Sequence, residues 1–188
     1  MKKLIALALA AGFSTAALAA PETYVIDDSH TFARFSYSHL GFSTQESRFD
    51  KTKGKITIDR AAKTGSTEIT IDTKSVNTGN ETFNGHIKGA DFFDVEKFPT
   101  ITFKSTRFNF SGDALASVDG NLTIKGITKP VNLKVTSFKC QPHPMAKKDA
   151  CGANATATIK RSEFNAGKYA PNVSDEVTLT LAVEAIKE

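Results

Sequence analysis

Apolar and polar residues alternate along most of this chain. The segments 55–59, 68–72 and 177–183 place Ile, Val or Leu at every second position, with mostly polar residues between them. Because successive side chains of a β-strand point to opposite faces, this pattern predicts strands with one buried and one solvated face. Runs of similar character cover residues 33–42, 100–110, 114–125, 131–138 and 153–160. The pattern therefore predicts about eight strands, antiparallel where short turns join them.

One of these runs changes its buried face partway along. Ile101 and Phe103 set the parity of its first half. Phe108 and Phe110 set the opposite parity in its second half, so the change falls near Ser105. An extra residue in one strand, a β-bulge, produces such a change and bends the strand. We therefore expect a bulge there, of the kind that shapes barrel corners.

One short helix is expected ahead of that strand. Thr78-Gly-Asn-Glu81 fits a capping box, and Phe83, Ile87 and Ala90 then fall on one helical face. Large apolar residues crowd the segment that follows, around Pro99. This segment is too short and too charged to span a bilayer. It is suited to covering an apolar interior.

Eight antiparallel strands can close into a barrel, whose interior is filled by side chains or holds one ligand. We predict an all-β fold: an eight-stranded antiparallel lipocalin-like barrel with one short helix covering an end and a ligand tunnel inside. A transmembrane barrel is the competing architecture. The absence of Trp argues against it. So do the charged residues that interrupt the strands, such as Lys104, Lys125, Lys134 and Glu184.

Phenylalanine is over-represented, with 14 residues of which only Phe13 lies in the N-terminal segment. A packed core explains any single one of them. A small barrel has little room for the whole set unless some rings line a chamber or its mouth. The candidate ligand-binding residues are Phe35, Tyr37, Phe42, Phe49, Phe83, Ile87, Phe92, Phe93 and Phe103.

Residues 1–19 have the organisation of a bacterial signal peptide. Lys2 and Lys3 precede an apolar run, which ends in the small-x-small cleavage motif Ala17-Leu-Ala19. We therefore expect cleavage and export to the periplasm or beyond the cell. Residues 20–188 then form a single domain, which is long enough to build a sizeable core.

Cys140 and Cys151 are the only cysteines. An even count in an exported chain predicts a disulfide between them. The alternative is a copper(I) site, because His143 and Met145 lie between the two cysteines and all four side chains are ligands for that ion. We favour the disulfide, since oxidised cysteines do not bind copper, and expect no metal.

Charge and motifs argue against two further classes of protein. The formal net charge of +4 falls to +2 without Lys2 and Lys3, and no Lys/Arg block exceeds two residues, so nucleic acid is not an expected partner. No nucleophile elbow, P-loop or zinc-protease motif occurs. Asp27-Asp-Ser-His30 holds acid, Ser and His side by side, but neighbours in an extended strand point apart. We therefore expect no catalytic residues and no enzyme.

Four groups of motif residues follow one another along the chain: Tyr24-x-Ile-Asp-x-x-His30-x-x-x-x-Phe35-x-x-x-His39-Leu-Gly41; Thr78 to Ile87 with Asp91-Phe-Phe93, Phe98-Pro99 and Phe103; Gly120-x-Leu-Thr-x-x-Gly-Ile-Thr-Lys-Pro-Val131; and Arg161-Ser-Glu-Phe164. Together they resemble the YceI-like family of periplasmic polyisoprenoid-binding proteins. The resemblance implies a lipocalin-like barrel whose apolar tunnel holds a ubiquinone tail or a polyprenyl lipid. One departure is Phe83-Asn84, where many relatives carry an Arg-Asp pair.

The leading hypothesis is therefore non-catalytic binding of an isoprenoid lipid or quinone, with no other cofactor and no stable membrane insertion. A second hypothesis is a periplasmic interaction or stress-protective module with a packed barrel and no lipid. A third is redox or metal handling around Cys140 and Cys151. An exposed Phe-rich mouth would also allow a homodimer.

Overall fold

The computed structural model describes residues 20–188, so the predicted signal peptide over residues 1–19 lies outside the described part. The elements follow in the order β1 (Glu22–Ile26), β2 (Phe32–His39), β3 (Ser43–Phe49), β4 (Thr52–Asp59), β5 (Thr64–Asp72), η1 (Thr73–Ser75), β6 (Val76–Asn77), α1 (Glu81–Lys88), β7 (Thr100–Ser111), β8 (Ala114–Ile124), β9 (Ile127–Pro142), β10 (Asp149–Lys160), η2 (Arg161–Phe164) and β11 (Glu176–Lys187). Among these residues no helix is long and apolar enough to cross a membrane.

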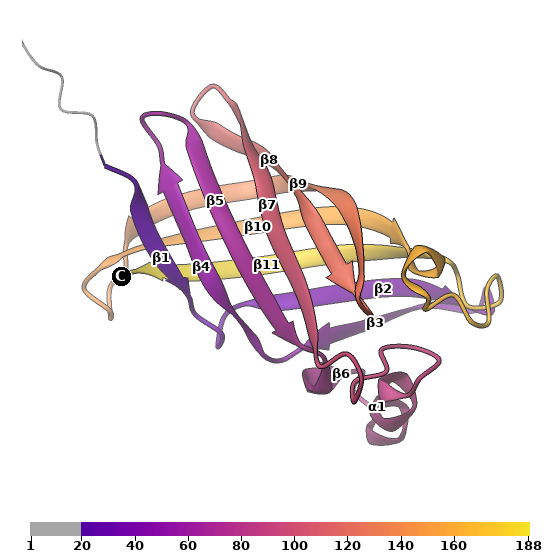
Figure 1. Cartoon of the computed structure of the whole chain (residues 1–188). Coiled ribbons are helices and arrows are strands. Elements are labelled where there is room, and N and C mark those ends of the chain that lie inside the picture. Colours follow the sequence, from indigo (N-terminus) through magenta and orange to yellow (C-terminus); the bar gives the residue numbers. More distant parts are fainter. Residues whose placement is uncertain (1–19) are drawn as a thin grey trace, which may run out of the picture.

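The strands close into an antiparallel barrel (Figure 1). The ring runs β1-β4-β5-β7-β8-β9-β10-β11 and returns to β1, which gives the predicted number of eight strands. Its members differ at one place, because β1 was not among the predicted runs, whereas the predicted run 33–42 forms β2, outside the ring. β2, β3 and β6 extend the sheet from β11, in the order β11-β2-β3-β6. β2 pairs with residues 178–182 of β11, while β1 pairs with residues 185–187 of the same strand, so β1 and β2 share one wall. The predicted fold is confirmed.

The predicted bulge is also present. The pairing of β7 with β8 shifts between Ser105 and Arg107. This shift lets Ile101, Phe103 and Phe108 all face inward, although their sequence parity differs, and all three are buried. The bend follows from the need to keep large apolar side chains on the concave face.

Helix α1 lies across one end of the barrel, beside β6 (Figure 1). Its N-cap is Asn80, whose side chain accepts the backbone N–H of Phe83 at 3.0 Å. The predicted capping box was therefore wrong by two residues. The Thr78 hydroxyl instead donates to Asn84 Oδ1 at 2.9 Å. Asn80 takes the cap because Asn is as strong an N-cap as Ser or Thr and stands closer to the first helical turn.

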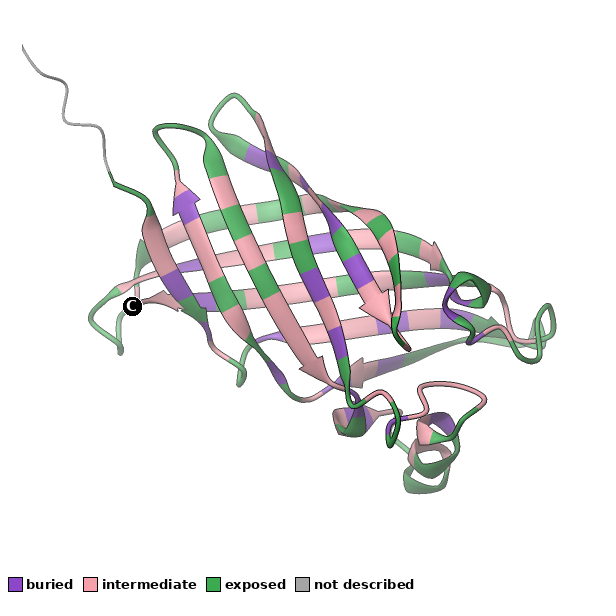
Figure 2. Ribbon diagram, in the orientation of Figure 1, coloured by how far each residue is buried: buried purple, intermediate pink, exposed green. Residues whose placement is uncertain are grey.

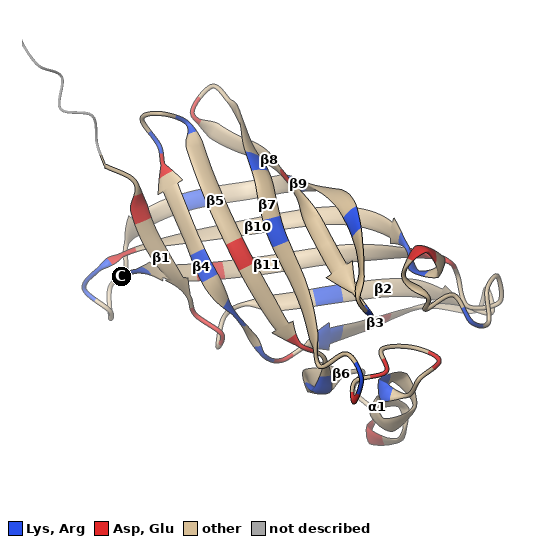
Figure 3. Ribbon diagram, viewed as in Figure 1, with Lys and Arg blue, Asp and Glu red and all other residues tan. Residues whose placement is uncertain are grey.

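Buried and exposed residues alternate along most strands (Figure 2). Basic and acidic residues are both distributed over the barrel strands (Figure 3). Two apolar clusters lie inside. The larger one contains the Phe residues near α1, and the smaller one, at the opposite end, contains the buried residues Tyr24, Ile26, Ile58, Cys151 and Ala185. Burial raises the pKa of Tyr24 to about 12, and a hydrogen bond to Glu22 acts in the same direction.

Cys140 and Cys151 form the predicted disulfide, at paired positions of β9 and β10. Replacing both cysteines with serine is expected to lower the free energy of unfolding by roughly 3 kcal/mol, because the unfolded chain regains the entropy of the closed loop. Urea unfolding with and without reductant measures this change. Reductant should shift the wild-type midpoint and leave the double variant unaffected. Equal wild-type midpoints in both conditions would contradict the prediction.

Candidate functional site

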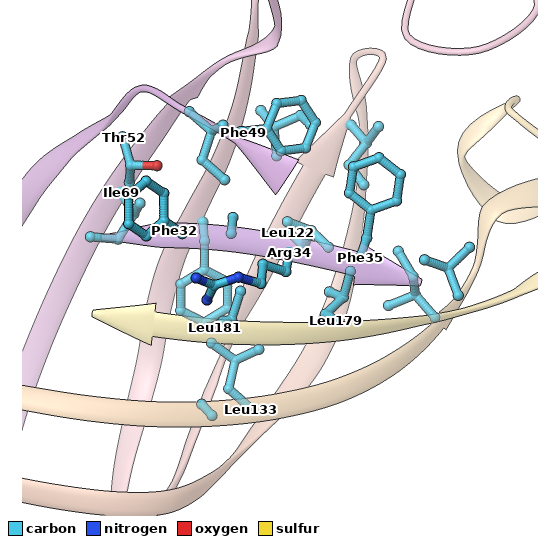
Figure 4. A pocket seen from close by; sticks show the side chains of 18 of the residues that line it. Phe32, Arg34, Phe35, Phe49, Thr52, Ile69, Leu122, Leu133, Leu179 and Leu181 are labelled. Carbon is cyan, nitrogen blue, oxygen red and sulfur yellow. The ribbon is translucent and has the colours of Figure 1, made fainter. Parts of the chain in front are cut away.

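The barrel encloses an apolar cavity of about 530 Å³. Inward side chains from all eight ring strands line it, and α1 and η2 contribute at one end. Figure 4 shows part of this lining, in which the labelled side chains are apolar apart from Arg34 and Thr52. The volume lies within the range of about 300–1,000 Å³ that is common for small-molecule sites. The site is suited to an apolar ligand.

The interior is hollow rather than filled by side chains. Ile69, Leu133, Leu179 and Leu181 all line the cavity, yet each remains only half-buried. In a packed interior such residues would be covered on every side. Their remaining surface faces the cavity, so it is available to a ligand that displaces water from it.

The cavity opens at the α1 end. Among the lining residues in the described chain, only five are exposed. They come from the end of β2 and the turn after it, from α1 and from the β10–β11 loop: His39, Leu40, His86, Tyr169 and Asn172. At the opposite end the lining residues belong to the smaller buried cluster around Tyr24. The cavity therefore has one mouth and one closed end.

Aromatic side chains attach the segment after α1 to the barrel wall. The Phe93 ring meets the Phe35 ring edge-on at 5.7 Å and the Phe49 ring at 5.2 Å. Phe92 stacks with Tyr169 across the mouth, with ring centroids 6.0 Å apart. Such pairs add about 0.5–1.5 kcal/mol each to their area burial. They hold the covering segment against both sides of the opening.

Polar contacts join the same two edges of the mouth. Lys168 Nζ lies 2.5 Å from Asp91 Oδ2. Lys125 Nζ donates to the backbone oxygens of Ala90 at 2.9 Å and Asn165 at 2.8 Å. The β10–β11 loop and the segment after α1 are therefore fixed relative to each other.

Eight of the nine predicted ligand-binding residues line this cavity: Phe35, Tyr37, Phe49, Phe83, Ile87, Phe92, Phe93 and Phe103. Their role in binding stays a prediction. Phe42 was wrongly placed, since it is 88% exposed and lies outside the lining. Strand β2 ends at His39, and Leu40 and Gly41 take positive φ angles of 53° and 73° in the turn. That turn removes Phe42 from the inner face.

Sequence reasoning missed much of the lining. The aliphatic residues of β9, β10 and β11 contribute fully, among them Leu133, Val135, Ile159, Leu179 and Leu181. Their period-2 pattern was visible, but apart from Ile87 only aromatic residues were selected as site residues. Arg161 was also missed as a lining residue. It was noticed only as part of the motif Arg161-Ser-Glu-Phe164, because a basic residue just after a strand is usually solvated.

Arg161 is 9% exposed and binds the loop that forms one side of the mouth. Its Nε donates to Ser174 O at 2.8 Å, and its Nη2 donates to Val173 O at 2.7 Å. Its Nη1 donates to Lys168 O at 2.8 Å and to Ala166 O. Burial lowers the pKa of Arg161, but guanidinium groups start so high that it stays charged.

Asp27, Ser29 and His30 do come together, contrary to prediction. They lie in the turn after β1 rather than in a strand. Ser29 Oγ lies 2.6 Å from Asp27 Oδ1, and His30 Nδ1 lies 2.8 Å from Asp27 Oδ2 and 3.0 Å from Ser29 Oγ. A catalytic triad needs the serine on the other ring nitrogen, Nε2. Here the serine hydroxyl and the aspartate carboxylate both contact Nδ1, so the arrangement does not activate the serine.

Two residues of this turn, together with Glu184 of β11, form the one group of metal-ligand type found among the described residues. Ligand atoms of Asp27, His30 and Glu184 lie within 4.8 Å of one another. Asp27 and His30 are already hydrogen-bonded to each other. The hydrogen bonds of Asp27 to His30 and to the backbone N–H of Ser29 hold the turn together. This structural role accounts for the closeness of Asp27 and His30.

His30 is expected to titrate above its ordinary pKa, because the hydrogen bond to Asp27 and the charge of that carboxylate favour the protonated ring. The resulting stabilisation is present below about pH 6.5, the pKa of the unfolded chain, and is lost as pH rises through the folded pKa. An NMR pH titration of the His30 ring measures this. Asp27→Asn should lower the midpoint, whereas Asp28→Asn should not. An Asp27→Asn midpoint equal to that of the wild type would contradict the assignment.

Comparison with known proteins places this chain among similar sequences and structures. The model of the YceI-like domain family matches residues 24–185. A UPF0312 protein of Pseudomonas aeruginosa (strain LESB58) is 36% identical over 190 residues, which cover 100% of this chain and 98% of the relative. Protein YceI of Salmonella arizonae is 34% identical with the same coverage.

Solved structures share the fold. The crystal structure of Burkholderia cenocepacia BcnA superposes with a TM-score of 0.72 and 27% identity, over 85% of this chain and 99% of that one. A polyisoprenoid binding domain from Saccharophagus degradans has a TM-score of 0.63 and 19% identity, over 88% and 98% of the two chains. At 19% identity, the similarity to the Saccharophagus domain shows a shared fold and nothing more.

Proposed function

Since this chain belongs to the YceI-like domain family, we propose that it binds an amphiphilic isoprenoid lipid in its barrel cavity, without catalysis. The observation that carries the proposal is a hollow apolar interior with one mouth, in a closed barrel. The Saccharophagus domain of the same fold is described as polyisoprenoid-binding, which supports the same class of ligand. An isoprenoid quinone such as ubiquinone, or a polyprenyl lipid, has the required tail.

The energetics of such binding are favourable. Each buried methylene contributes about 0.8 kcal/mol, so about ten methylenes of a tail supply roughly 8 kcal/mol. Lost freedom of the two partners and ordering of the tail reduce this value. The net binding free energy is therefore smaller than about 8 kcal/mol, which corresponds to an affinity weaker than about 1 μM. An affinity of this order permits loading and release, as transport, storage or sequestration requires.

A periplasmic location is part of the proposal. The Cys140–Cys151 disulfide is typical of oxidising compartments. The N-terminal segment has the pattern of an export signal. The disulfide also leaves no free cysteine for the redox or copper hypothesis within the described residues.

The hollow interior favours lipid binding over the packed interaction module. A homodimer stays a prediction. Leu40 and Phe42 are 51% and 88% exposed at the β2–β3 turn and offer apolar surface for it. Light scattering on the purified protein measures the oligomeric state.

Native mass spectrometry of the protein purified from its own periplasm tests the proposal, with organic extraction to identify what is bound. A stoichiometric adduct identified as an isoprenoid quinone or polyprenyl lipid is expected. A ligand-free mass that persists after incubation with ubiquinone and with a polyprenol would overturn the proposal and favour the packed module.

A further inference from the structure

Two buried hydroxyls of residues that line the cavity, those of Tyr37 and Thr52, have no hydrogen-bond partner among the described residues. The hydroxyl of Tyr37 is the one that lies on the same side as a buried cation. Tyr37 is 8% exposed and lines the cavity from β2. Among the described residues its Oη has no partner in hydrogen-bond geometry, although the Ser47 hydroxyl lies near it. Burial raises the pKa of Tyr37, while the Ser47 hydroxyl and the Arg161 charge act in the opposite direction. Leaving a buried hydroxyl unpaired is unfavourable, so a native structure that keeps one requires a reason.

Arg161 is connected to the end of β2 through the β10–β11 loop. It donates to the backbone oxygens of Val173 and Ser174, and these two residues pair with His39 and Ser38, which follow Tyr37 in the chain. Arg161 also lines the cavity. A guanidinium carries five N–H groups, and four of them donate to the backbone oxygens of residues 166, 168, 173 and 174. One hydrogen on Nη2 remains outside these bonds. Two donors, a phenol and a guanidinium N–H, are therefore available in one region of an apolar cavity.

We propose that Tyr37 and Arg161 form a head-group subsite that receives an uncharged carbonyl oxygen, such as that of an isoprenoid quinone ring. This assignment rests on the proposed function and adds an orientation to it. Both residues belong to elements that reach the mouth, and the closed end lies around Tyr24. The head therefore lies near α1, and the tail extends toward the closed end.

A carbonyl fits these donors better than a phosphate does. Apart from histidines, the charged residues that line the cavity within the described chain are Arg34 and Arg161. Arg34 stacks on the Phe32 ring at 5.3 Å. Asp175 lies near enough to raise the pKa of Arg161, so its negative charge already balances part of that cation. A buried phosphate would bring more negative charge than this site can neutralise.

A carbonyl also fits better than an alcohol. Its oxygen has two lone pairs and can accept from Tyr37 and Arg161 at once. An alcohol must also donate its own hydrogen, and the guanidinium offers no acceptor. Tyr37 would then have to accept that hydrogen and could not donate to the same oxygen. One donor of the pair would stay unsatisfied.

Three probes with one geranylgeranyl tail test the subsite: ubiquinone-4, geranylgeraniol and geranylgeranyl phosphate. Calorimetric titration should give tightest binding for ubiquinone-4. Tyr37→Phe keeps the ring and removes the hydroxyl, so it should weaken ubiquinone-4 binding roughly fivefold to tenfold. The same variant should melt at the wild-type temperature or above when ligand-free, because an unpaired buried hydroxyl is gone. Weaker binding together with an unchanged or higher melting temperature would show that the Tyr37 hydroxyl contacts the ligand and does not stabilise the fold.

Ser36→Ala is the matched control, since it removes a hydroxyl from the next position of β2, outside the cavity lining. It should bind all three probes as the wild type does. Equal affinities for the probes, with Tyr37→Phe unchanged, would overturn the subsite while leaving lipid binding intact. Tightest binding of the phosphate would overturn the uncharged head group. Failure of every probe to bind the wild type would overturn the proposed function itself.

Discussion

An Ala155→Trp variant is expected to lose about a hundredfold or more in affinity for a polyprenyl ligand while the barrel stays folded. Ala155 faces the cavity from β10, between Val135 of β9 and Leu181 of β11. Both neighbours are only half-buried, so an indole ring can extend into the hollow interior. There it excludes part of the tail. Displacing about four methylenes removes roughly 3 kcal/mol of binding free energy.

The matched control is Thr158→Trp on the same strand. Thr158 is exposed and pairs with Thr178 on the outer side of the sheet. This variant should bind ubiquinone-4 as the wild type does. Calorimetric titration measures the affinities, and thermal unfolding followed by circular dichroism checks that both variants fold. Wild-type affinity in a folded Ala155→Trp protein would show that the tail does not run past β10.

Arg161→Met is expected to lower the free energy of unfolding by about 4 kcal/mol, among the largest effects of a single substitution. The side chain is buried and satisfies four backbone oxygens of the β10–β11 loop. Methionine fills similar space but donates nothing, so those oxygens lose charge-assisted hydrogen bonds worth about 1.5–3 kcal/mol each before the loop relaxes toward water. Urea unfolding measures the change.

Two comparisons separate this effect from a general loss of charge. Lys160→Met changes the preceding, exposed residue and should leave stability within about 0.5 kcal/mol of the wild type. Arg161→Lys keeps the charge, but an ammonium group has three donors and no planar fork, so it should recover only part of the loss. If Arg161→Met unfolds at the wild-type urea midpoint, the loop does not depend on the guanidinium.

Local patterns predicted a large part of the fold. Strict alternation over residues 177–183 correctly indicated β11. In a strand with one solvated and one buried face, polar and apolar residues alternate at every second position. The parity change near Ser105 indicated the bulge for the same reason. Cys140 and Cys151 could be paired because they are the only two cysteines of the chain. In each case the physical requirement acts within one segment or concerns a single pair.

Other elements carried no such local signal. Strand β3 has one large apolar residue, Phe49, and alternates poorly, so it was not predicted. It forms because β2 offers it a hydrogen-bonding edge on one side and β6 on the other. Phe42 shows the reverse error, since its aromatic character suggested burial while the Leu40–Gly41 turn exposes it.

The candidate site, like the fold, was predictable from the sequence only in part. Alternation and the supply of phenylalanine were enough to predict an apolar barrel interior, because the removal of apolar surface from water depends on composition and strand periodicity. The chain alone could not show that Tyr37 and Arg161 line the same cavity, since 124 positions separate them along the sequence. Closure of the barrel brings β2 and η2 to one end. Polar contacts inside a cavity are long-range and directional, and only the folded chain decides them.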